Sequence, residues 1–495
     1  MPGERRLPRA TPESQGLPSR AVTGFLDAVA AEGQELHSLM VVVGGAVVAE
    51  GWFAPYQRER RHELFSLSKS FTSTAVGFAQ AEGLLSVDDL VLDHFPDDAP
   101  AEPDPNLGRM RVRHLLTMTT GHHDAADDGT FSAPDWVRGF LSLPVQHEPG
   151  THFVYNTAAS YMLSAIVQKV TGLRALDYLT PRLLEPLGIE GATWQQSPQG
   201  VDTGGFGIWA TTEDIACFAQ LYLQDGRWNG RRVLPEGWVA DASRPHTVST
   251  HSNGDPDWVQ GYGYQLWRGR HGTFRGDGAF GQFALVLPEQ HAVVAITAGS
   301  DNMQGILDLV WHLFAAMPTD QGAVLAPDPD GEAGLAERLA GLRLDPSRLT
   351  GAAPLAADVA GRTITLEPNG FGIRSAVIEP GAERTRITLV GPTGEVVIDA
   401  GHGAWVAGWI PEGTRDGTRP DPTRSDLTQA VVAAVGWPAP DTMILELRLI
   451  ETAFLLRLTA VFDGAMVRVG ADLNVWFGPS HIADVVGRLE GRRVT

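Results

Sequence analysis

The chain has 495 residues, of which 43% are hydrophobic and 20% are charged, a composition typical of folded globular proteins. Its formal net charge is −21 at pH 7, and no basic block interrupts this acidic excess, which argues against nucleic acid and anionic membranes as partners and favours a small-molecule substrate. The chain is longer than a domain with one ordinary hydrophobic core, so two domains are expected.

The N-terminal sequence, MPGERRLPRATPESQG, carries charge without the apolar stretch of a secretory signal. No window approaches the run of about 18 apolar residues that a membrane span requires. The single cysteine, Cys217, has no partner for an internal disulfide. We therefore expect a cytoplasmic protein. The sequence gives no indication of its oligomeric state.

The first part of the chain mixes strand and helix patterns. Residues Ser38–Ala54 alternate β-forming side chains around Gly44-Gly45, which predicts a hairpin, and the helical stretch that follows it ends at Gly83. Further helices are predicted at Ala158–Val170, Glu213–Leu223 and Asn302–Met317, and late strands at Gly261–Trp267, Phe283–Leu287 and Ala292–Ala298. Strands at both ends of this segment, with helices between them, predict one mixed sheet whose first and last strands meet.

The second part is different in pattern. After Met317 the sequence PTDQGAVLAPDPDGEAG has the composition of a linker. A short helix near Glu337–Leu342 precedes repeated β-rich segments that are separated by turns such as Asp463-Gly464, which predict a barrel or sandwich of about eight strands. We therefore expect a first domain at 1–320, a linker at 321–334 and an all-β domain at 335–495.

One candidate catalytic pair stands out. Among 38 basic residues only Lys69 and Lys169 are lysine, the one basic type of the two that can lose its proton and act as a base. Ser66 and Lys69 open the first long helix, where a spacing of three residues brings a hydroxyl and an amine within hydrogen-bond reach and the helix N-terminus favours an oxyanion. The alternative is an ordinary N-cap serine followed by a solvated lysine.

A metal or cofactor site is not expected. The chain lacks the GxSxG, HExxH, GxxxxGK and post-strand GxGxxG signatures. The sequence His122-His123-Asp124 offers ligand types, but adjacent histidines in an extended loop point apart and no second ligand pair stands at metal spacing.

The context of Ser66 resembles a known family. The segments HELFSLSKSFTSTAVGFAQAEGLLSVDDLV, RVRHLLTMTTGH and EPGTHFVYNTAASYMLSAIVQKVTG are similar, in order and spacing, to the motifs of class C serine β-lactamases, D-aminopeptidases and related esterases. The resemblance covers about Leu7–Met317. It implies a β-lactamase/transpeptidase-like α/β domain, an antiparallel sheet with a helical subdomain, and catalysis by Ser66 without a cofactor. The β-rich tail resembles the lipocalin-like barrels of some family members.

The second motif of this family is a tyrosine followed two residues later by asparagine. Here it reads Tyr155-Asn156-Thr157. The resemblance gives Tyr155 the role of relaying a proton between Ser66 and the leaving group, which a phenol can fill if Lys69 lowers its pKa. Thr157 stands at the amide position and Asn156 one step early, so either is a candidate to orient the lysine or the substrate. The alternative for Tyr155 is a core aromatic residue.

The third motif is Lys-Thr-Gly or His-x-Gly on the strand that lines the cleft, and it corresponds to Gly276-Asp277-Gly278. Gly278 lets substrate approach, and the N–H of Ala279 is expected to join that of Ser66 in an oxyanion hole. The cationic group that holds a substrate carboxylate is absent, and Asp277 would repel one. Efficient β-lactam hydrolysis is therefore disfavoured, and neutral or cationic esters and amides are the expected substrates.

These features predict a serine hydrolase that forms an acyl-enzyme at Ser66. Two alternatives remain: an acyltransferase that uses the same acyl-enzyme, and a non-catalytic binding protein with a decayed site. For the β-rich tail there are also two interpretations. It restricts access to the cleft, or it covers an apolar face of the first domain.

Overall fold

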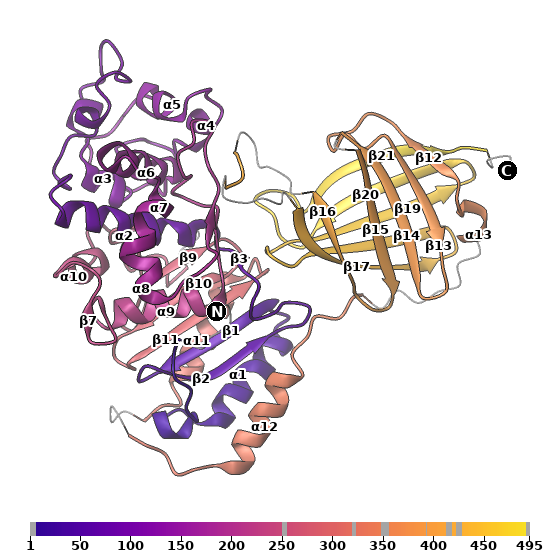
Figure 1. The fold of residues 1–495 in the computed structure, drawn as a ribbon, viewed down its shortest axis with the longest axis horizontal. Coiled ribbons are helices and arrows are strands. Elements are labelled where there is room, and N and C mark those ends of the chain that lie inside the picture. The colour runs from indigo at the N-terminus through magenta and orange to yellow at the C-terminus, as the bar shows by residue number, and fades with distance from the viewer. Residues whose placement is uncertain are drawn as a thin grey trace.

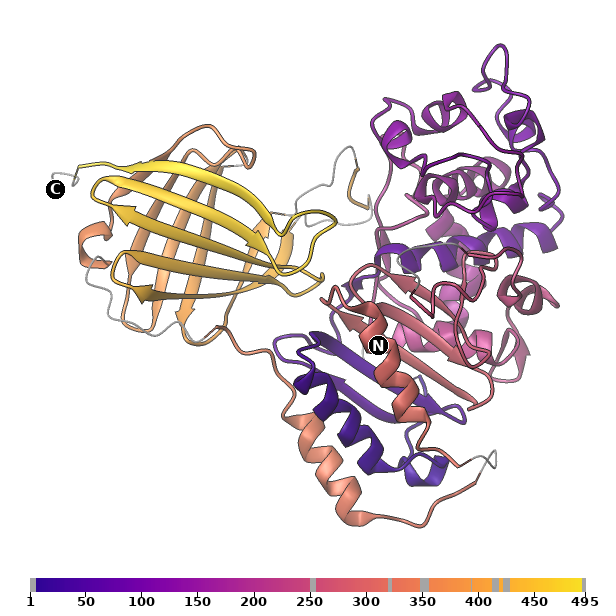
Figure 2. The ribbon, with the colours of Figure 1, turned by 180° about the vertical axis from the view of Figure 1, so that it is seen from behind.

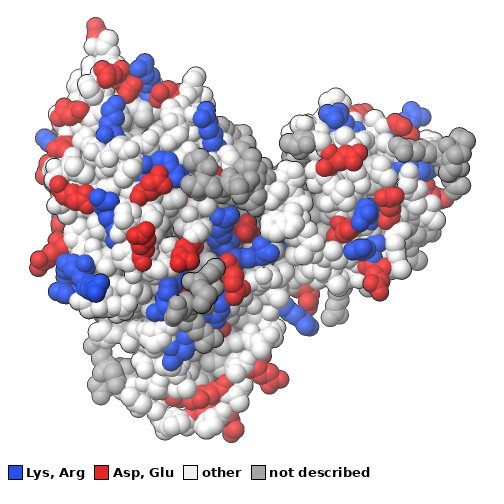
Figure 3. Space-filling view, in the orientation of Figure 1, with Lys and Arg blue, Asp and Glu red and all other residues white. Residues whose placement is uncertain are grey.

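The computed structural model describes residues 6–249, 255–318, 323–347, 356–392, 394–411, 418–421 and 428–491. They form a mixed α/β domain and a β-barrel that lie side by side (Figures 1 and 2). None of the helices in these ranges combines the length and apolarity needed to span a membrane. Acidic and basic side chains are interspersed over the face drawn in Figure 3.

The first domain is built on a six-stranded antiparallel sheet of order β2-β1-β11-β10-β9-β8. Its strands are β1 (Leu36–Val43), β2 (Ala46–Trp52), β8 (Trp267–Arg268), β9 (Phe274–Gly278), β10 (Gln282–Leu287) and β11 (Ala292–Ala298). The pairing of β1 with β11 confirms the prediction that the first and last strands meet.

The predicted strand at Gly261–Trp267 is wrong, because only Trp267 at its end belongs to β8. Gly261 has a φ of 107° and Gln265 a φ of 59°. Both values lie outside the extended region of backbone conformations, so the alternating apolar pattern is carried by a loop.

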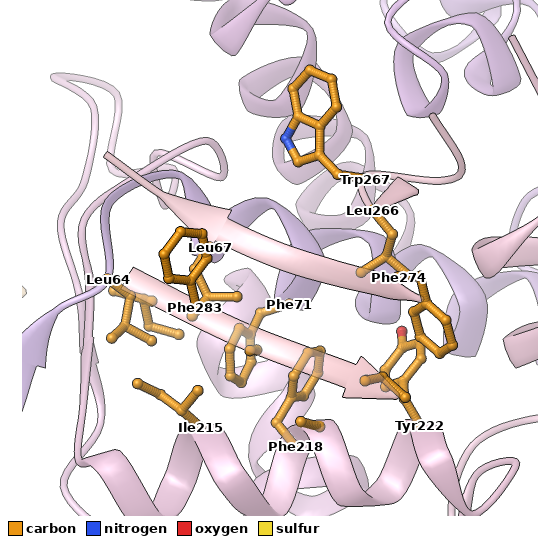
Figure 4. Close-up of a cluster of buried hydrophobic side chains, with 14 of the residues drawn as sticks. Leu64, Leu67, Phe71, Ile215, Phe218, Tyr222, Leu266, Trp267, Phe274 and Phe283 are labelled. Carbon is orange, nitrogen blue, oxygen red and sulfur yellow. The ribbon is translucent and has the colours of Figure 1, made fainter. Parts of the chain in front are cut away.

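Helices cover both faces of this sheet. Helix α9 (Thr212–Leu223) packs across β1, β10 and β11, while α1 (Ser19–Ala31), α11 (Met303–Phe314) and α12 (Pro329–Ala340) pack together on the other side (Figure 2). Figure 4 shows the core between α9, α2 (Ser68–Ala81) and the strands β9 and β10, where Phe71 stacks on Phe218 with ring centroids 4.2 Å apart. These contacts fix α2, which carries Lys69, against the sheet.

A helical subdomain is inserted between β2 and β8. It contains α3 (Val112–Leu116), α4 (Asp127–Phe131), α5 (Trp136–Ser142), α6 (Thr157–Thr171), α7 (Ala175–Leu179), α8 (Glu185–Leu187) and α10 (Trp238–Ser243), with short strands β3 (His62–Glu63), β4 (Thr193–Trp194), β5 (Ile208–Ala210), β6 (Arg227–Trp228) and β7 (Arg231–Arg232). The predicted helices correspond to α2, α6, α9 and α11. Helix α6 packs along α2, which brings the N-terminal ends of two helices to one place.

The C-terminal domain is a closed barrel of nine strands rather than about eight. Its strands run in the order β15-β14-β13-β12-β21-β20-β19-β18-β17, β17 closes on β15, and β16 extends the sheet from β17. Their bounds are β12 (Thr363–Leu366), β13 (Ser375–Pro380), β14 (Arg384–Gly391), β15 (Gly394–His402), β16 (Val406–Pro411), β17 (Thr428–Ala439), β18 (Thr442–Leu449), β19 (Leu455–Asp463), β20 (Met466–Leu473) and β21 (His481–Leu489); the short helix α13 (Ala356–Val359) precedes them. The pairing of β15 with β17 joins the two ends of the nine-stranded sheet.

The expected domain boundary falls inside α12. The predicted linker at 321–334 and the predicted start of the second domain at 335 divide this helix, yet Leu335 and Leu342 are buried in the core of the first domain. The helix begins at Pro329, with Asp328 as its N-cap, so a sequence that is rich in Pro, Gly and Asp serves here as a helix start. We propose that the first domain extends to about Leu344.

The barrel covers an apolar surface of the first domain. Phe65 and Phe280 pack against Ala453, Phe454 and Val475 in one buried cluster, which we name the interface cluster. Beside it, the buried guanidinium of the barrel residue Arg448 binds Glu35 at 2.6 Å. Of the two interpretations of the tail, these contacts favour the covering role.

We expect Phe454→Ala to lower the free energy of unfolding by about 3 kcal/mol, because it leaves a cavity in the interface cluster. Urea unfolding followed by circular dichroism measures this. Phe371, which is 45% exposed on the barrel, provides the control, and Phe371→Ala should change stability by less than about 0.5 kcal/mol. Equal unfolding midpoints for the two variants would contradict a supporting role for the interface.

Candidate active site

Ser66 and Lys69 lie together where β3 passes into α2. Ser66 is in the single 3-10 turn Phe65–Leu67 that precedes the helix, and Lys69 is in the first turn of α2. The Lys69 amine Nζ lies 3.0 Å from Ser66 Oγ, 2.8 Å from the carbonyl oxygen of Gly205 and 3.3 Å from Thr157 Oγ1. The predicted pair is thus brought together, with two further acceptors that come from distant parts of the chain.

Lys69 is poised to act as a base. Its side chain is only 1% exposed, and burial lowers the pKa of its amine to about 7, although the nearby carboxylates of Asp127 and Asp277 oppose the shift. Burial disfavours the charged form of an amine because the ammonium loses its hydration. A substantial fraction of Lys69 is therefore neutral at neutral pH.

The three contacts of Lys69 suit the neutral amine. A neutral amine has two N–H donors and one lone pair. When the N–H groups are donated to Gly205 and Thr157, the lone pair is left facing the Ser66 hydroxyl. Since Gly205 has no Cβ, it can approach this closely: a Cβ there would lie 2.5 Å from the Thr157 side chain. This arrangement can accept the proton of Ser66 as its oxygen attacks.

Tyr155 lies beside this pair, and its ring centroid is 4.9 Å from the Lys69 amine. Its phenol hydrogen-bonds with Ser66. The condition for its relay role, that Lys69 lowers the pKa of Tyr155, is not met: burial, and after it the negative charge of Asp277, raise the pKa of this phenol well above its usual value. The phenol of Tyr155 is therefore protonated at neutral pH and can donate a hydrogen bond, which argues against a phenolate base.

The residues after Tyr155 have separate positions. Thr157, at the position of the family's amide, contacts Lys69, as described above. Asn156 is fully buried, its side-chain oxygen accepts the N–H of Ala159 at 3.2 Å, and it caps α6. We therefore propose a capping role for Asn156 in place of substrate contact. Asp127, which the sequence did not single out, accepts the N–H of Ala158 at 2.8 Å and strengthens the same helix start.

The segments that hold the proposed oxyanion donors lie against each other. A Cβ on Gly278 would collide with the carbonyl oxygen of Leu64, so only glycine lets β9 pass this close to the Ser66 segment. Phe65 and Phe280, which flank the two segments, have φ values of 48° and 66°, uncommon for bulky residues. We propose the N–H groups of Ser66 and Ala279 as the oxyanion hole.

The third motif is filled differently from that of the family. A Cβ on Gly276 would meet the side chains of Leu67 and Ser70, so a lysine or histidine there would require these helix side chains to move. Asp277 is 6% exposed and accepts a hydrogen bond at 2.9 Å from the guanidinium of Arg275, itself 1% exposed. Arg275 was not predicted from the sequence, although its i, i+2 spacing from Asp277 on a strand places both on one face.

The fold and the site together define a β-lactamase/transpeptidase-like protein with an SxxK pair. The family described as Beta-lactamase matches residues 26–309, and the chain belongs to this family. The 6-aminohexanoate-dimer hydrolase of Paenarthrobacter ureafaciens is 26% identical over 279 residues, covering 52% of this chain and 71% of that protein. Protein flp of Staphylococcus aureus strain MW2 is 27% identical over 287 residues, covering 51% of this chain and 55% of that protein.

Solved structures show the same fold. A Bacillus anthracis protein provisionally named a 6-aminohexanoate-dimer hydrolase matches with a TM-score of 0.51 and 19% identity, over 63% of this chain and 86% of its own. A Bacteroides dorei protein provisionally named a beta-lactamase also has a TM-score of 0.51, with 17% identity, over 60% of this chain and 98% of its own. At these identities the likeness concerns the fold alone.

The lowered pKa of Lys69 predicts how acylation depends on pH. If the neutral amine is the base, the acylation rate should be constant well above pH 7 and fall about tenfold per unit below it. Single-turnover acylation by an activated ester, measured from pH 5 to 9, tests this.

Lys69→Arg serves as the matched variant, because it keeps the charge but cannot give up its proton. We expect no measurable acylation. A rate within about tenfold of the parent, which is under about 1.4 kcal/mol in barrier, would contradict a base role for Lys69.

Proposed function

We propose that the chain is a serine hydrolase that cleaves ester or amide bonds of small molecules through an acyl-enzyme on Ser66. The observation that carries this proposal is the buried Lys69 amine, whose N–H groups have acceptors in Gly205 and Thr157 while its third contact is the Ser66 hydroxyl. Membership of the beta-lactamase family supports it. So does the 6-aminohexanoate-dimer hydrolase named among the relatives.

In the proposed reaction, Ser66 passes its proton to Lys69 while Oγ attacks the carbonyl carbon. The N–H groups of Ser66 and Ala279 bind the oxyanion that forms. As the carbonyl–leaving group bond breaks, Tyr155 donates its proton to the leaving group. It receives in return the proton that Lys69 took from Ser66, so no free phenolate is needed. This matches its raised pKa. Water then attacks the ester of Ser66 by the same steps in reverse order.

The charge of the site favours neutral substrates. The position at which family members carry the cation that holds a carboxylate is Gly276 in this chain, and Leu67 and Ser70 occupy the space beside it. The cation nearest to it on β9, Arg275, is bound to Asp277 in a buried pair. A substrate carboxylate would have to compete with Asp277 for the guanidinium. We therefore propose uncharged esters and amides as substrates, and poor turnover of penicillins.

Labelling with a fluorophosphonate tests the nucleophile. We expect one adduct per chain by intact-protein mass spectrometry, located on Ser66, because it is the serine within reach of Lys69. Ser66→Ala should abolish the label, and Ser132→Ala, which changes an exposed serine, should not. Labelling that survives Ser66→Ala, or a complete lack of labelling of the folded parent, would favour the non-catalytic binding protein.

Asp277→Asn tests the basis of substrate charge selection. The change leaves the Arg275 guanidinium without its counter-charge, so we expect kcat/KM for a carboxylate-bearing ester to rise about tenfold relative to a matched neutral ester, or about 1.4 kcal/mol. The double variant Asp277→Asn/Arg275→Gln restores neutrality and should restore the ratio. Thermal melting confirms that each variant folds. An unchanged ratio in the folded single variant rules out this role for Asp277.

A further inference from the structure

Three imidazole rings gather at one loop junction outside the proposed active site. They belong to His123, His147 and His152, and one ligand nitrogen from each lies within 4.8 Å of the others. Nδ1 of His123 is 3.0 Å from Nε2 of His147, and the rings of His147 and His152 are 4.2 Å apart. The sequence analysis found no second ligand pair near His123, because the pair is supplied by a loop more than twenty residues further along the chain.

The backbone that carries these histidines is firmly connected. The N–H of His147 donates to the carbonyl of Gly121 at 2.8 Å, and the N–H of Gly150 donates to Thr119 at 2.8 Å. The N–H of His123 donates to the side chain of Gln146 at 3.0 Å. Gly121 has a φ of 91°, and a Cβ there would collide with the carbonyl of His147. The two loops are thus joined before any ligand binds, which lowers the entropic cost of binding one.

A hydrogen bond between two neutral imidazoles explains the contact of His123 with His147, and the ring of His152 is held separately. Nε2 of His152 lies 3.3 Å from the carbonyl oxygen of His123. This contact holds the His152 ring beside the rings of His123 and His147. His123 is exposed and the other two are half-buried, so ions in solution can reach the cluster.

We propose that His123, His147 and His152 bind one divalent transition-metal ion, with Zn²⁺ as the leading candidate. Imidazole nitrogen is a preferred ligand of zinc. At a Zn–N distance of about 2.0–2.1 Å, two nitrogens of a tetrahedral site stand about 3.3 Å apart, close to the separation of His123 and His147. Water completes the coordination. This proposal does not depend on the proposed hydrolase activity.

The ion would have a structural effect on the active site. His152 precedes Tyr155 by three residues, in the segment that leads into α6. The N–H of Val154, between them, donates to the carbonyl of Met118 at 3.0 Å. A metal that ties His152 to His123 would therefore restrain the segment that places the Tyr155 phenol beside Ser66. We assign the ion a positioning role, without contact to the reacting atoms.

Isothermal titration of the untagged, chelator-treated full chain with ZnCl₂ tests the site. We expect one ion per chain and a higher melting temperature with zinc. His147→Ala and His152→Gln should each weaken binding at least tenfold and abolish the zinc-dependent rise in melting temperature. The control is His312→Ala, which removes an exposed histidine on α11 and should leave both readouts unchanged.

Circular dichroism of the metal-free variants establishes whether they fold. If His147→Ala does not fold, His152→Gln provides a second test of the site. The proposal assumes a dissociation constant of about 1 µM or below, so about 100 µM free zinc should saturate the site. A parent chain that binds no zinc at this concentration would overturn the proposal. Equal binding by the parent and a folded cluster variant would overturn it too, since the ion would then sit elsewhere.

Discussion

The burial of Lys69 is the constraint on which the rest of the site depends. The amine lies between α2 and α6 without a salt bridge to any described residue. It is held by the hydroxyls of Ser66 and Thr157 and by the carbonyl oxygen of Gly205. Two carboxylates, Asp127 and Asp277, act on it from further away, yet loss of hydration outweighs them and lowers its pKa to about 7. A direct carboxylate partner would reverse this balance and keep the lysine charged.

Close backbone packing makes that burial possible. Gly205, Gly276 and Gly278 each stand where a Cβ would meet a neighbouring segment. At Gly205 the missing side chain brings a carbonyl to the lysine, and at the other two it lets β9 lie directly against the start of α2. The same packing fills the space beside Gly276, where the family's third motif carries a cation, with the side chains of Leu67 and Ser70. The burial of Lys69 and the absence of a side chain at Gly276 thus belong to the same close packing of β9 and α2.

Sequence reasoning found the parts of the site that depend on local geometry. Ser66 and Lys69 are one helical turn apart, so their contact follows from spacing. The strand patterns at both ends of the first domain predicted that β1 and β11 meet. What it missed depends on tertiary contacts. The Gly205 carbonyl reaches Lys69 across 136 residues, and the pKa of Tyr155 rises because of its surroundings. Composition also misled, since the linker-like sequence at Pro329 starts a helix that packs on the first domain.

The barrel takes part in this geometry through aromatic packing. Phe65 and Phe280 both adopt left-handed backbone conformations, which cost about 1–2 kcal/mol each for residues with a side chain, and their rings meet edge to face at 5.5 Å. Phe454 of the barrel contacts the two rings at 5.8 and 5.9 Å. Since these phenylalanines adjoin the proposed oxyanion donors Ser66 and Ala279, the barrel stabilises a strained backbone that the first domain alone would hold less firmly. The contact of the described part of the second domain with the proposed site is therefore one of backbone support.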